Sequence, residues 1–302
     1  MLKIAFFTEA GSKRGYGHLI RSYTIFEEFK HHDATFFLDS DIDFDKKFKN
    51  IHYFSWDTLS IEKKYDIILI DSYEADLKIY KMLHKHTKLL VSLDDFRRLE
   101  YPSGIIINFA PDAKILYYPK LKKNYTYLLG LDYIPIRKKI LKLKVEKKEQ
   151  LFIMLGGADI GNLTLTIVKY IQNVNINKLV VHNNPNIVQE LQKLPNVKVL
   201  YKPDDTTLIK AMKESSMAIT TASMTAYELS SIQIPTIVVA VAKNQRNGIG
   251  QLLKHGIAAF SLDSISEVSS LVKKLRSKEY KLVKSIDGLG SKRIYNKVME
   301  LL

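Results

Sequence analysis

The chain has 302 residues, of which 46% are hydrophobic and 26% are charged. This length suits two domains of about 150 residues each. The composition is that of a folded globular protein and excludes a disordered, collagen-like or disulfide-stapled chain. Because the sequence contains no cysteine, disulfides, a thiolate nucleophile and cysteine-based zinc or iron–sulfur sites are also excluded.

The formal net charge of +14 raises nucleic acid as a partner. The cations are spread along the chain, however, and the densest run, residues 137–148, contains no aromatic residue that could stack on bases. We interpret this run as a solvated linker whose positive field favours an anionic small substrate. No nucleic-acid partner is expected.

No apolar run reaches the roughly 18 to 20 residues needed to span a bilayer, and the longest, residues 234–242, has about half of that length. The first residues lack the charged, apolar and small-residue regions of a secretory signal. We therefore expect no membrane span and a cytoplasmic location.

Short runs of apolar and branched residues recur through both halves and predict strands. Nearly continuous hydrophobicity is expected of strands buried on both faces of a parallel sheet. The runs fall at residues 3–8, 35–39, 66–71, 89–93 and 105–109, and again at 151–155, 179–182, 197–201, 218–221 and 236–241.

Stretches with helical spacing separate these runs. The alternation predicts an α/β protein with two Rossmann-like doubly wound domains, 1–137 and 138–302, and an inter-domain cleft. The charged segment 136–150 is the expected connection, and a helical tail from about residue 281 would pack back on the first domain. The predicted helices are 18–29, 75–86, 162–171, 185–194, 204–213 and 224–231.

The sharpest motif is Gly-Tyr-Gly-His at residues 15–18, between the first strand and the first helix, with Arg21 three residues later. Ligands of parallel sheets bind beyond the carboxyl ends of strands, so this turn is well placed. Gly17 would let a ligand approach the backbone. Ile20 stands where a dinucleotide fingerprint has its third glycine. His18 is the best general-base candidate, although helix capping fits the same position.

A second glycine turn follows the first strand of the second half, where residues 156–162 read Gly-Gly-Ala-Asp-Ile-Gly-Asn. Facing the first turn across a cleft, it would hold a ligand that spans both domains. The alternative fits equally well: Asp159 or Asn162 caps the helix, and Gly157 relieves crowding.

A third segment, Thr-Thr-Ala-Ser at residues 220–223, precedes a helix that carries Glu228. Hydroxyls and amides at a helix start suit a pyrophosphate, and a carboxylate can accept hydrogen bonds from ribose hydroxyls. A nucleoside diphosphate is therefore a reasonable ligand. The alternative is a Ser or Thr cap with a solvated Glu228.

Metal-binding patterns are weak. The histidines at 31–32 and 84–86 lack ligand spacing, and no His-Glu-x-x-His pattern occurs. Asp-Asp at 94–95 fits a strand-end turn better than a metal pair. Neither a Walker-type phosphate loop nor a Gly-x-Ser-x-Gly elbow is present.

Four segments in this order resemble the UDP-sugar hydrolases of pseudaminic acid biosynthesis. Those enzymes have the two-domain GT-B fold and are similar to the glycosyltransferase that acts on lipid-linked muramyl pentapeptide. The resemblance extends from the first strand to about residue 255. The segments are 15–21 (Gly-Tyr-Gly-His-Leu-Ile-Arg), 92–95 (Ser-Leu-Asp-Asp), 156–163 (Gly-Gly-Ala-Asp-Ile-Gly-Asn-Leu) and 243–245 (Lys-Asn-Gln).

The resemblance implies hydrolysis, without a metal or cofactor, of a UDP-linked 2,4-diacetamido-2,4,6-trideoxy sugar to UDP and the free altrose derivative. By position, His18 resembles the base that activates water, and Asn244 joins it in the catalytic set. The implied substrate-binding residues are Gly17, Arg21, Tyr73, Gly157, Asp159, Asn162, Ser223, Glu228 and Gln245.

The chain departs from the family near the expected sugar pocket. The family usually has an Arg and an Asp near the end of the first strand, where this chain reads Phe7-Thr8-Glu9, and a His before the tyrosine, where this chain has Ser72. These departures bear on which sugar is bound.

The resulting hypothesis is inverting attack at the anomeric carbon by a water that His18 deprotonates, with helix N-termini and neutral donors stabilising the departing diphosphate. The alternative is a glycosyltransferase with the same fold and nucleotide site, which passes the sugar to an acceptor hydroxyl. A nucleic-acid-binding protein ranks third, because no recognition motif accompanies the charge. No partner protein is indicated.

Overall fold

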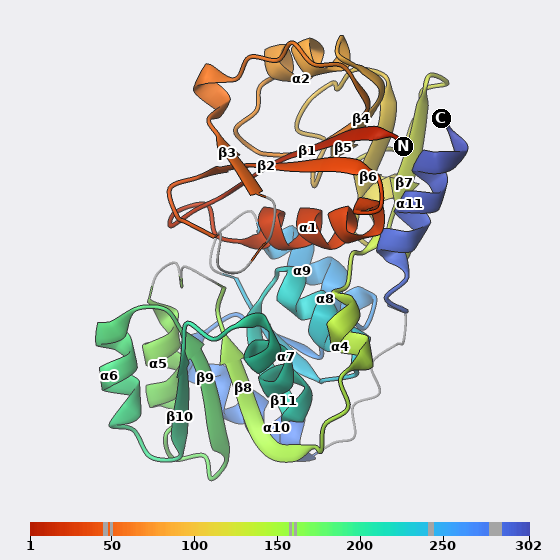
Figure 1. Cartoon of the computed structure of the whole chain (residues 1–302). Coiled ribbons are helices and arrows are strands. Elements are labelled where there is room, and N and C mark those ends of the chain that lie inside the picture. The colour runs from red at the N-terminus through yellow and green to blue at the C-terminus, as the bar shows by residue number, and fades with distance from the viewer. Residues whose placement is uncertain (45–47, 49–50, 157–158, 160–161, 241–244, 278–285) are drawn as a thin grey trace. The chain divides into compact units, whose positions relative to one another are not determined.

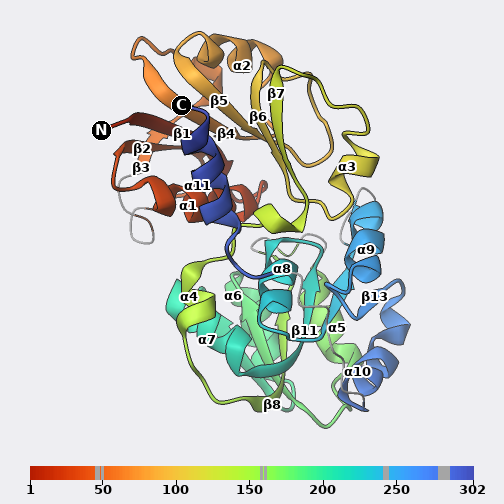
Figure 2. The same cartoon turned by 90° about the vertical axis from the view of Figure 1, so that its right-hand side faces the viewer.

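The computed structural model describes residues 1–302 except 45–47, 49–50, 157–158, 160–161, 241–244 and 278–285. The chain divides into two compact units, shown in Figures 1 and 2. Unit 1 comprises residues 1–136 and 287–302, and unit 2 comprises residues 137–286. The change of unit between Ile136 and Arg137 lies one residue from the expected boundary.

Unit 1 is built on a seven-stranded parallel sheet in the order β3-β2-β1-β4-β5-β6-β7 (Figure 1). Its strands are β1 (Lys3–Ala10), β2 (Asp33–Ser40), β3 (Ile51–Phe54), β4 (Tyr65–Asp71), β5 (Thr87–Leu93), β6 (Gly104–Asn108) and β7 (Tyr125–Leu129). Its helices are α1 (Gly17–Phe29), α2 (Leu77–His84), α3 (Ala113–Leu116) and α11 (Gly290–Glu300), with 3₁₀ turns at Trp56–Thr58 and Leu131–Tyr133. The strand order switches direction between β1 and β4, and ligands of such sheets bind at the carboxyl ends of the strands beside this point.

Aromatic side chains cover both faces of β1. On one face, Phe6 packs edge-on against Phe26 and Phe29 of α1. On the other face, Phe7 stacks on Phe37 with ring centroids 4.7 Å apart. Successive residues of a strand point to opposite faces. Because both faces are buried, the strand reads as an unbroken hydrophobic run.

The C-terminal helix α11 packs on α1 and belongs to unit 1 (Figure 2). The rings of Phe29 and Tyr295 lie 4.9 Å apart, and Ile294 and Val298 are fully buried. At the start of the helix, a Cβ on Gly290 would lie 2.1 Å from the carbonyl oxygen of Ile134. The close approach of these two segments therefore requires a glycine.

Unit 2 has a six-stranded parallel sheet in the order β10-β9-β8-β11-β12-β13. Its strands are β8 (Lys148–Met154), β9 (Asn177–His182), β10 (Val197–Tyr201), β11 (Ser215–Thr221), β12 (Thr236–Val239) and β13 (Phe260–Leu262). Its helices are α4 (Lys138–Lys142), α5 (Leu163–Tyr170), α6 (Pro185–Gln192), α7 (Asp205–Glu214), α8 (Met224–Ser231), α9 (Gln245–Lys254) and α10 (Val268–Ser277), with a 3₁₀ turn at Ile265–Glu267. The order repeats that of unit 1, so the switch point lies between β8 and β11.

The connecting segment differs from the solvated linker expected from its lysines. Ile140, in α4, is fully buried, and Lys213 donates a hydrogen bond to its carbonyl oxygen at 2.5 Å. The solvated interpretation is wrong for this residue, because the short helix turns one apolar side chain inward among the exposed lysines. In the part of the chain that the structure describes, no helix is long and apolar enough to cross a membrane.

Candidate functional site

A tight glycine turn places His18 beyond the carboxyl end of β1. The backbones of Gly11 and Gly15 exchange two hydrogen bonds of 2.9 and 3.1 Å. Gly15 has a φ of 74°, in the left-handed region that glycine adopts without strain. The turn leads directly into α1, so Gly17 and His18 form its first two positions.

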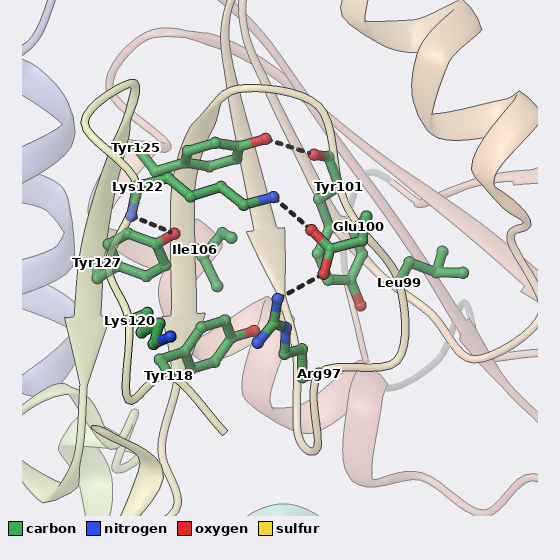
Figure 3. Close-up of a pocket in the computed structure, with 10 residues that line it drawn as sticks. All are labelled: Arg97, Leu99, Glu100, Tyr101, Ile106, Tyr118, Lys120, Lys122, Tyr125 and Tyr127. Carbon is green, nitrogen blue, oxygen red and sulfur yellow. Dashed lines mark hydrogen bonds and ion pairs between the residues drawn. The ribbon is translucent and has the colours of Figure 1, made fainter. Parts of the chain in front are cut away.

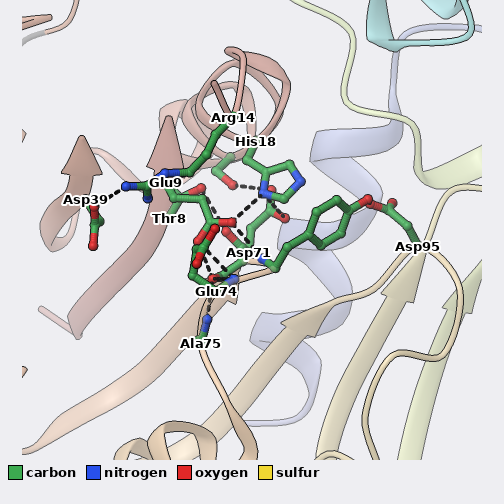
Figure 4. A network of polar contacts seen from close by, with 12 residues as sticks. Thr8, Glu9, Arg14, His18, Asp39, Asp71, Glu74, Ala75 and Asp95 are labelled. Carbon is green, nitrogen blue, oxygen red and sulfur yellow. Dashed lines mark hydrogen bonds and ion pairs between the residues drawn. The ribbon is translucent and has the colours of Figure 1, made fainter. Parts of the chain in front are cut away.

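The imidazole of His18 faces two buried carboxylates (Figure 4). Its Nδ1 lies 3.6 Å from Oε1 of Glu9 and 3.7 Å from Oδ1 of Asp71. These carboxylates come from β1 and β4 and are 2% and 0% exposed. The distances are those of ion pairs and exceed hydrogen-bond length. The two negative groups favour a proton on Nδ1, which leaves Nε2 as the basic nitrogen.

Glu9 is held by neutral donors. Its Oε1 accepts from the backbone N–H of Tyr73 at 2.7 Å, and its Oε2 accepts from the Trp56 indole at 2.9 Å and from the hydroxyl of Ser72. Glu9 and Ser72, which belong to the two segments where the chain departs from the family, are thus bonded to each other. These donors satisfy the hydrogen bonding of the buried carboxylate without supplying a counter-charge.

Arg21 lies one turn after His18 and binds two aspartates. Its Nε and Nη2 donate to Asp71 at 2.7 and 2.6 Å, and its Nη1 and Nη2 donate to Asp95 at 2.9 and 3.0 Å. Burial lowers the pKa of the guanidinium, but the two carboxylates raise it by more. Burial likewise raises the pKa of Asp95, and Arg21, together with His18 and Tyr73, lowers it by more. An arginine has five N–H donors. Four of those of Arg21 are used by the two aspartates, so one N–H remains for the expected contact with the substrate.

Tyr73 follows β4 and lies beside His18. The two rings meet edge to face, with centroids 4.4 Å apart. The phenol hydroxyl donates to Asp95, and burial together with this carboxylate raises the pKa of Tyr73. Its hydroxyl therefore acts as a neutral donor, while 48% of the residue remains exposed.

Asp94 accepts hydrogen bonds from a different set of residues than Asp95 does. Its carboxylate accepts from the hydroxyls of Tyr101 and Tyr118, both at 2.7 Å, and from the backbone N–H of Arg98 at 2.9 Å. Since Asp95 turns to Arg21 instead, the two neighbouring aspartates do not converge, as expected for a strand-end turn. Among the residues that the structure describes, no group of three or more His, Asp or Glu is arranged to hold a metal ion.

A small pocket in unit 1 does not have His18 among its lining residues (Figure 3). Within it, Glu100 pairs with Arg97 and Lys122, and the hydroxyl of Tyr125 donates to the carbonyl oxygen of Tyr101 at 2.9 Å. These groups already have protein partners, so we assign no chemistry to the pocket. It is lined by Arg97, Leu99, Glu100, Tyr101, Ile106, Tyr118, Lys120, Lys122, Tyr125 and Tyr127.

In unit 2, Asp159 binds a histidine that the sequence patterns do not reveal. Its Oδ2 lies 3.0 Å from Nε2 of His182, and the backbone N–H of Asn184 donates to Nδ1 of the same ring at 3.0 Å. The proton of His182 is therefore on Nε2 and points to Asp159. The carboxylate also accepts from the backbone N–H of Thr164, at 3.3 to 3.4 Å, in the first turn of α5. Asp159 thus acts as a buried helix cap.

Asn162 precedes α5 with a φ of 52° and makes no side-chain capping bond. Ser223 precedes α8 and likewise makes no capping bond to that helix. Of the other expected residues, Gly157 and Asn244 lie outside the described residues, and Gln245 is described only as the first residue of α9.

Glu228, on α8, is 2% exposed and bound by an arginine. Its Oε1 and Oε2 accept from Nε and Nη2 of Arg137 at 2.6 and 2.7 Å, and Arg137 also pairs with Asp205. Burial lowers the pKa of Arg137, and these carboxylates raise it by more. The alternative of a solvated Glu228 is wrong, because the arginine fork pairs with it in the interior. A ribose contact would have to share the carboxylate with Arg137.

The structure therefore groups the expected residues by unit. Gly17, His18, Arg21 and Tyr73 lie together at the switch point of unit 1. Asp159, Asn162, Ser223 and Glu228 follow β8 and β11, the switch-point strands of unit 2. The sequence does not predict the pairings that these residues make with Glu9, Asp71, Asp95, Arg137 and His182.

Two parallel sheets of the same order, on two units of one chain, define the GT-B fold. The solved structure of the calicheamicin glycosyltransferase CalG4 has a TM-score of 0.67 and 12% identity, covering 100% of this chain and 98% of that chain. MurG from Acinetobacter baumannii has a TM-score of 0.63 and 11% identity, with 99% of each chain covered. These likenesses confirm the expected fold class.

Sequence comparison leads to particular relatives. The chain is 30% identical over 191 residues to the pseudaminic acid cytidylyltransferase and UDP-2,4-diacetamido-2,4,6-trideoxy-beta-L-altropyranose hydrolase of Helicobacter pylori, covering 60% of this chain and 35% of that protein. It therefore spans about a third of the length of this relative. It is 25% identical over 270 residues to the UDP-2,4-diacetamido-2,4,6-trideoxy-beta-L-altropyranose hydrolase of Campylobacter jejuni, covering 84% of this chain and 97% of that protein. The resemblance expected from the four motifs is confirmed, while no protein-family model matches.

Proposed function

We propose that the chain hydrolyses a UDP-linked 2,4-diacetamido-2,4,6-trideoxy sugar to UDP and the free sugar. The observation that carries this proposal is His18, held at the switch point of unit 1 with Nδ1 against Glu9 and Asp71. A histidine in this setting suits a general base. The substrate class comes from the names of the two relatives.

In the proposed reaction, Nε2 of His18 takes a proton from a water that attacks the anomeric carbon on the face opposite UDP. The bond from this carbon to the diphosphate oxygen breaks, its electron pair leaves with UDP, and the configuration inverts. The imidazolium that forms is stabilised by Glu9 and Asp71. Catalytic contacts that are long in a ligand-free structure often shorten in the reacting complex, and distances of 3.6 and 3.7 Å fit that behaviour.

Unit 2 is proposed to bind the nucleotide. The start of α8, with Ser223, offers N–H groups and a hydroxyl to the diphosphate, and Glu228 accepts from the ribose hydroxyls beside Arg137. Gly157, Asp159 and Asn162 face the nucleotide, and Asn244 and Gln245 contact the sugar and the diphosphate. Stabilisation of UDP by neutral donors supports hydrolysis without a metal ion.

A glycosyltransferase is the second candidate, and the structural likeness to CalG4 favours it. Both candidates share the nucleotide site and the base. They differ in whether a water or an acceptor hydroxyl occupies the attacking position.

The deciding experiment is product analysis by NMR after incubating the protein with a panel of UDP-diacetamido sugars and no acceptor. If the proposal is right, the 2,4-diacetamido-2,4,6-trideoxy substrate should give UDP and free sugar. His18→Ala should abolish turnover while UDP binding stays within about threefold, since the loss of a general base alone costs about 10²- to 10⁴-fold in rate. His52→Ala, at an exposed histidine of β3, is the matched control. Release of UDP only when an acceptor is added would establish the transferase instead.

A further inference from the structure

Two half-exposed aromatic rings lie side by side at the site, and one of them contacts His18. Tyr73 and Phe96 are each 48% exposed, and their ring centroids lie 5.6 Å apart. Tyr73 in turn meets the imidazole of His18 edge to face at 4.4 Å. The two residues follow the neighbouring strands β4 and β5. We call Tyr73 and Phe96 the aromatic corner.

The aromatic corner is held in place by polar contacts behind it. The backbone N–H of Tyr73 donates to Glu9 at 2.7 Å and its hydroxyl donates to Asp95, which Arg21 fixes with two further bonds. On the other side, Asp94 accepts from the backbone N–H of Arg97, the residue after Phe96, at 2.5 Å. The exposed rings therefore form a preorganised apolar surface, which reduces the cost of binding.

The charges around the aromatic corner favour an uncharged substituent of the bound sugar over an anionic one. Three carboxylates lie behind the aromatic corner: Arg21 pairs with Asp71 and Asp95, and Glu9 is held by neutral donors. This negative excess repels an anionic substituent. A hydroxyl or an amide placed against the ring faces would lose its hydrogen bonds to water, whereas a methyl group has none to lose.

We propose that the aromatic corner receives the C6 methyl group of the sugar, and that Phe96 determines a preference for a 6-deoxy sugar over its 6-hydroxy analogue. This inference rests on the proposed function and on attack beside His18. The C6 methyl fits better than the methyl of an acetamido group, because the latter also carries an N–H and a carbonyl oxygen that need partners.

The test compares kcat/KM for the UDP-linked 6-deoxy substrate and its 6-hydroxy analogue. Wild type should prefer the 6-deoxy sugar by about tenfold to a hundredfold, the range of one apolar contact in a pocket. In Phe96→Ala the preference should fall below about threefold, through a loss of about tenfold or more on the 6-deoxy sugar, and Phe96→Leu should keep part of it. Tyr201→Ala, at an equally exposed ring in unit 2, should leave the preference unchanged.

If Phe96→Ala folds poorly, a binding measurement on wild type and Phe96→Leu tests the same contact. Saturation-transfer NMR with the free 6-deoxy sugar should show its strongest signal at the C6 methyl in wild type and a weaker one in Phe96→Leu. An active enzyme whose preference is the same in wild type and Phe96→Ala or Phe96→Leu overturns the role of the aromatic corner alone. A wild type that releases no UDP from the 6-deoxy substrate overturns the proposed function and this inference together.

Discussion

Glu9 and Asp71 face the same nitrogen of His18 but differ in their counterions. Asp71 shares its charge with Arg21, at 2.6 and 2.7 Å, whereas the donors that hold Glu9 are neutral. A carboxylate without a bound cation interacts more strongly with a forming imidazolium. Glu9 is therefore the side chain whose charge supports the proposed base most directly.

Replacing Glu9 by glutamine tests this difference. Glu9→Gln keeps the shape and removes the charge, so kcat should fall by about tenfold to a hundredfold, equivalent to roughly 1.4 to 2.7 kcal/mol of transition-state stabilisation. KM should stay within about twofold, because the charge acts mainly on the transition state. Steady-state kinetics measure both constants. Glu74→Gln, an exposed neighbour, is the control, and an unchanged kcat in Glu9→Gln would remove the carboxylate from the mechanism.

The ribose contact proposed for Glu228 is measurable without turnover. Wild type should bind UDP more tightly than 2′,3′-dideoxy-UDP by about tenfold to a hundredfold, since hydrogen bonds to a charged group contribute roughly 1.5 to 3 kcal/mol. Glu228→Ala should bind both nucleotides equally. Titration calorimetry gives both affinities, with Glu190→Ala on the surface of α6 as control. If Glu228→Ala keeps the wild-type ratio, the carboxylate serves Arg137 and not the ribose.

For each interaction in the site, one of the two residues is easier to predict from the sequence than its partner. The turn that carries His18 is predictable, because glycines and a histidine between a strand and a helix form a local pattern. Glu9 and Asp71 leave a weaker signal: each is an acidic residue at the end of a buried hydrophobic run. The pairs Asp159–His182 and Arg137–Glu228 are 23 and 91 residues apart in sequence. Tertiary packing creates such pairs, and no spacing rule predicts them.

Strands in the middle of each sheet are easier to predict from the sequence than most strands at the sheet edges, because they are more completely buried. β1, β4, β8 and β11 are each paired with a strand on both sides, and their buried middles are apolar runs, such as Ile-Ala-Phe-Phe in β1 and Leu-Phe-Ile in β8. Of the four edge strands, β10 is predicted at residues 197–201, whereas β3, β7 and β13, which are short and only partly buried, are not. Their sequences, such as Ile-His-Tyr-Phe in β3, resemble loops as much as strands, and the sequence patterns do not predict them.

A buried lysine in β9 makes the stability of unit 2 depend on pH. Lys178 is 1% exposed, and its ammonium donates to the carbonyl oxygens of Val174 and Ile176 at 3.1 Å each. Burial lowers its pKa. Because the charged form is destabilised by folding, the unfolding free energy rises as pH increases through the folded-state pKa towards the unfolded value of about 10.4.

Lys178→Met should remove this contribution. We expect the unfolding free energy of wild type, relative to Lys178→Met, to increase between neutral pH and pH of about 10, the window below the unfolded pKa. Urea unfolding at several pH values measures it. Lys198→Met, at an exposed lysine of the neighbouring β10, should track wild type, and parallel pH curves for wild type and Lys178→Met would contradict the account.

At the scale of the whole chain, its two ends meet in one unit. α11 joins unit 1 through Ile294 and Val298, which are fully buried. The rhythm of strands and helices predicts two domains, because each βα repeat is local in sequence. The sequence also predicts that the helical tail packs on the first domain, but the residues of α1 that it contacts emerge only from the folded structure.

The contact at Gly290 tests how closely the chain end is joined to unit 1. Gly290→Ala would place a Cβ 2.1 Å from the backbone of Ile134, so the segments must move apart. The expected loss is about 1 to 3 kcal/mol of unfolding free energy, as for overpacked cores. Gly250→Ala, in a helix with open space around the glycine, should not destabilise the protein. A stable Gly290→Ala, measured by urea unfolding, would mean that the helix is loosely attached.

In the proposed reaction, water attacks the anomeric carbon of a UDP-sugar with the help of His18. The most direct measurement is the reaction in ¹⁸O-labelled water without acceptor, followed by mass spectrometry of the released UDP and immediate NMR of the sugar. We expect UDP free of ¹⁸O, a first-formed sugar of inverted anomeric configuration, and no product with His18→Ala. Label in the diphosphate, retained configuration, or normal turnover by His18→Ala would contradict the proposed reaction.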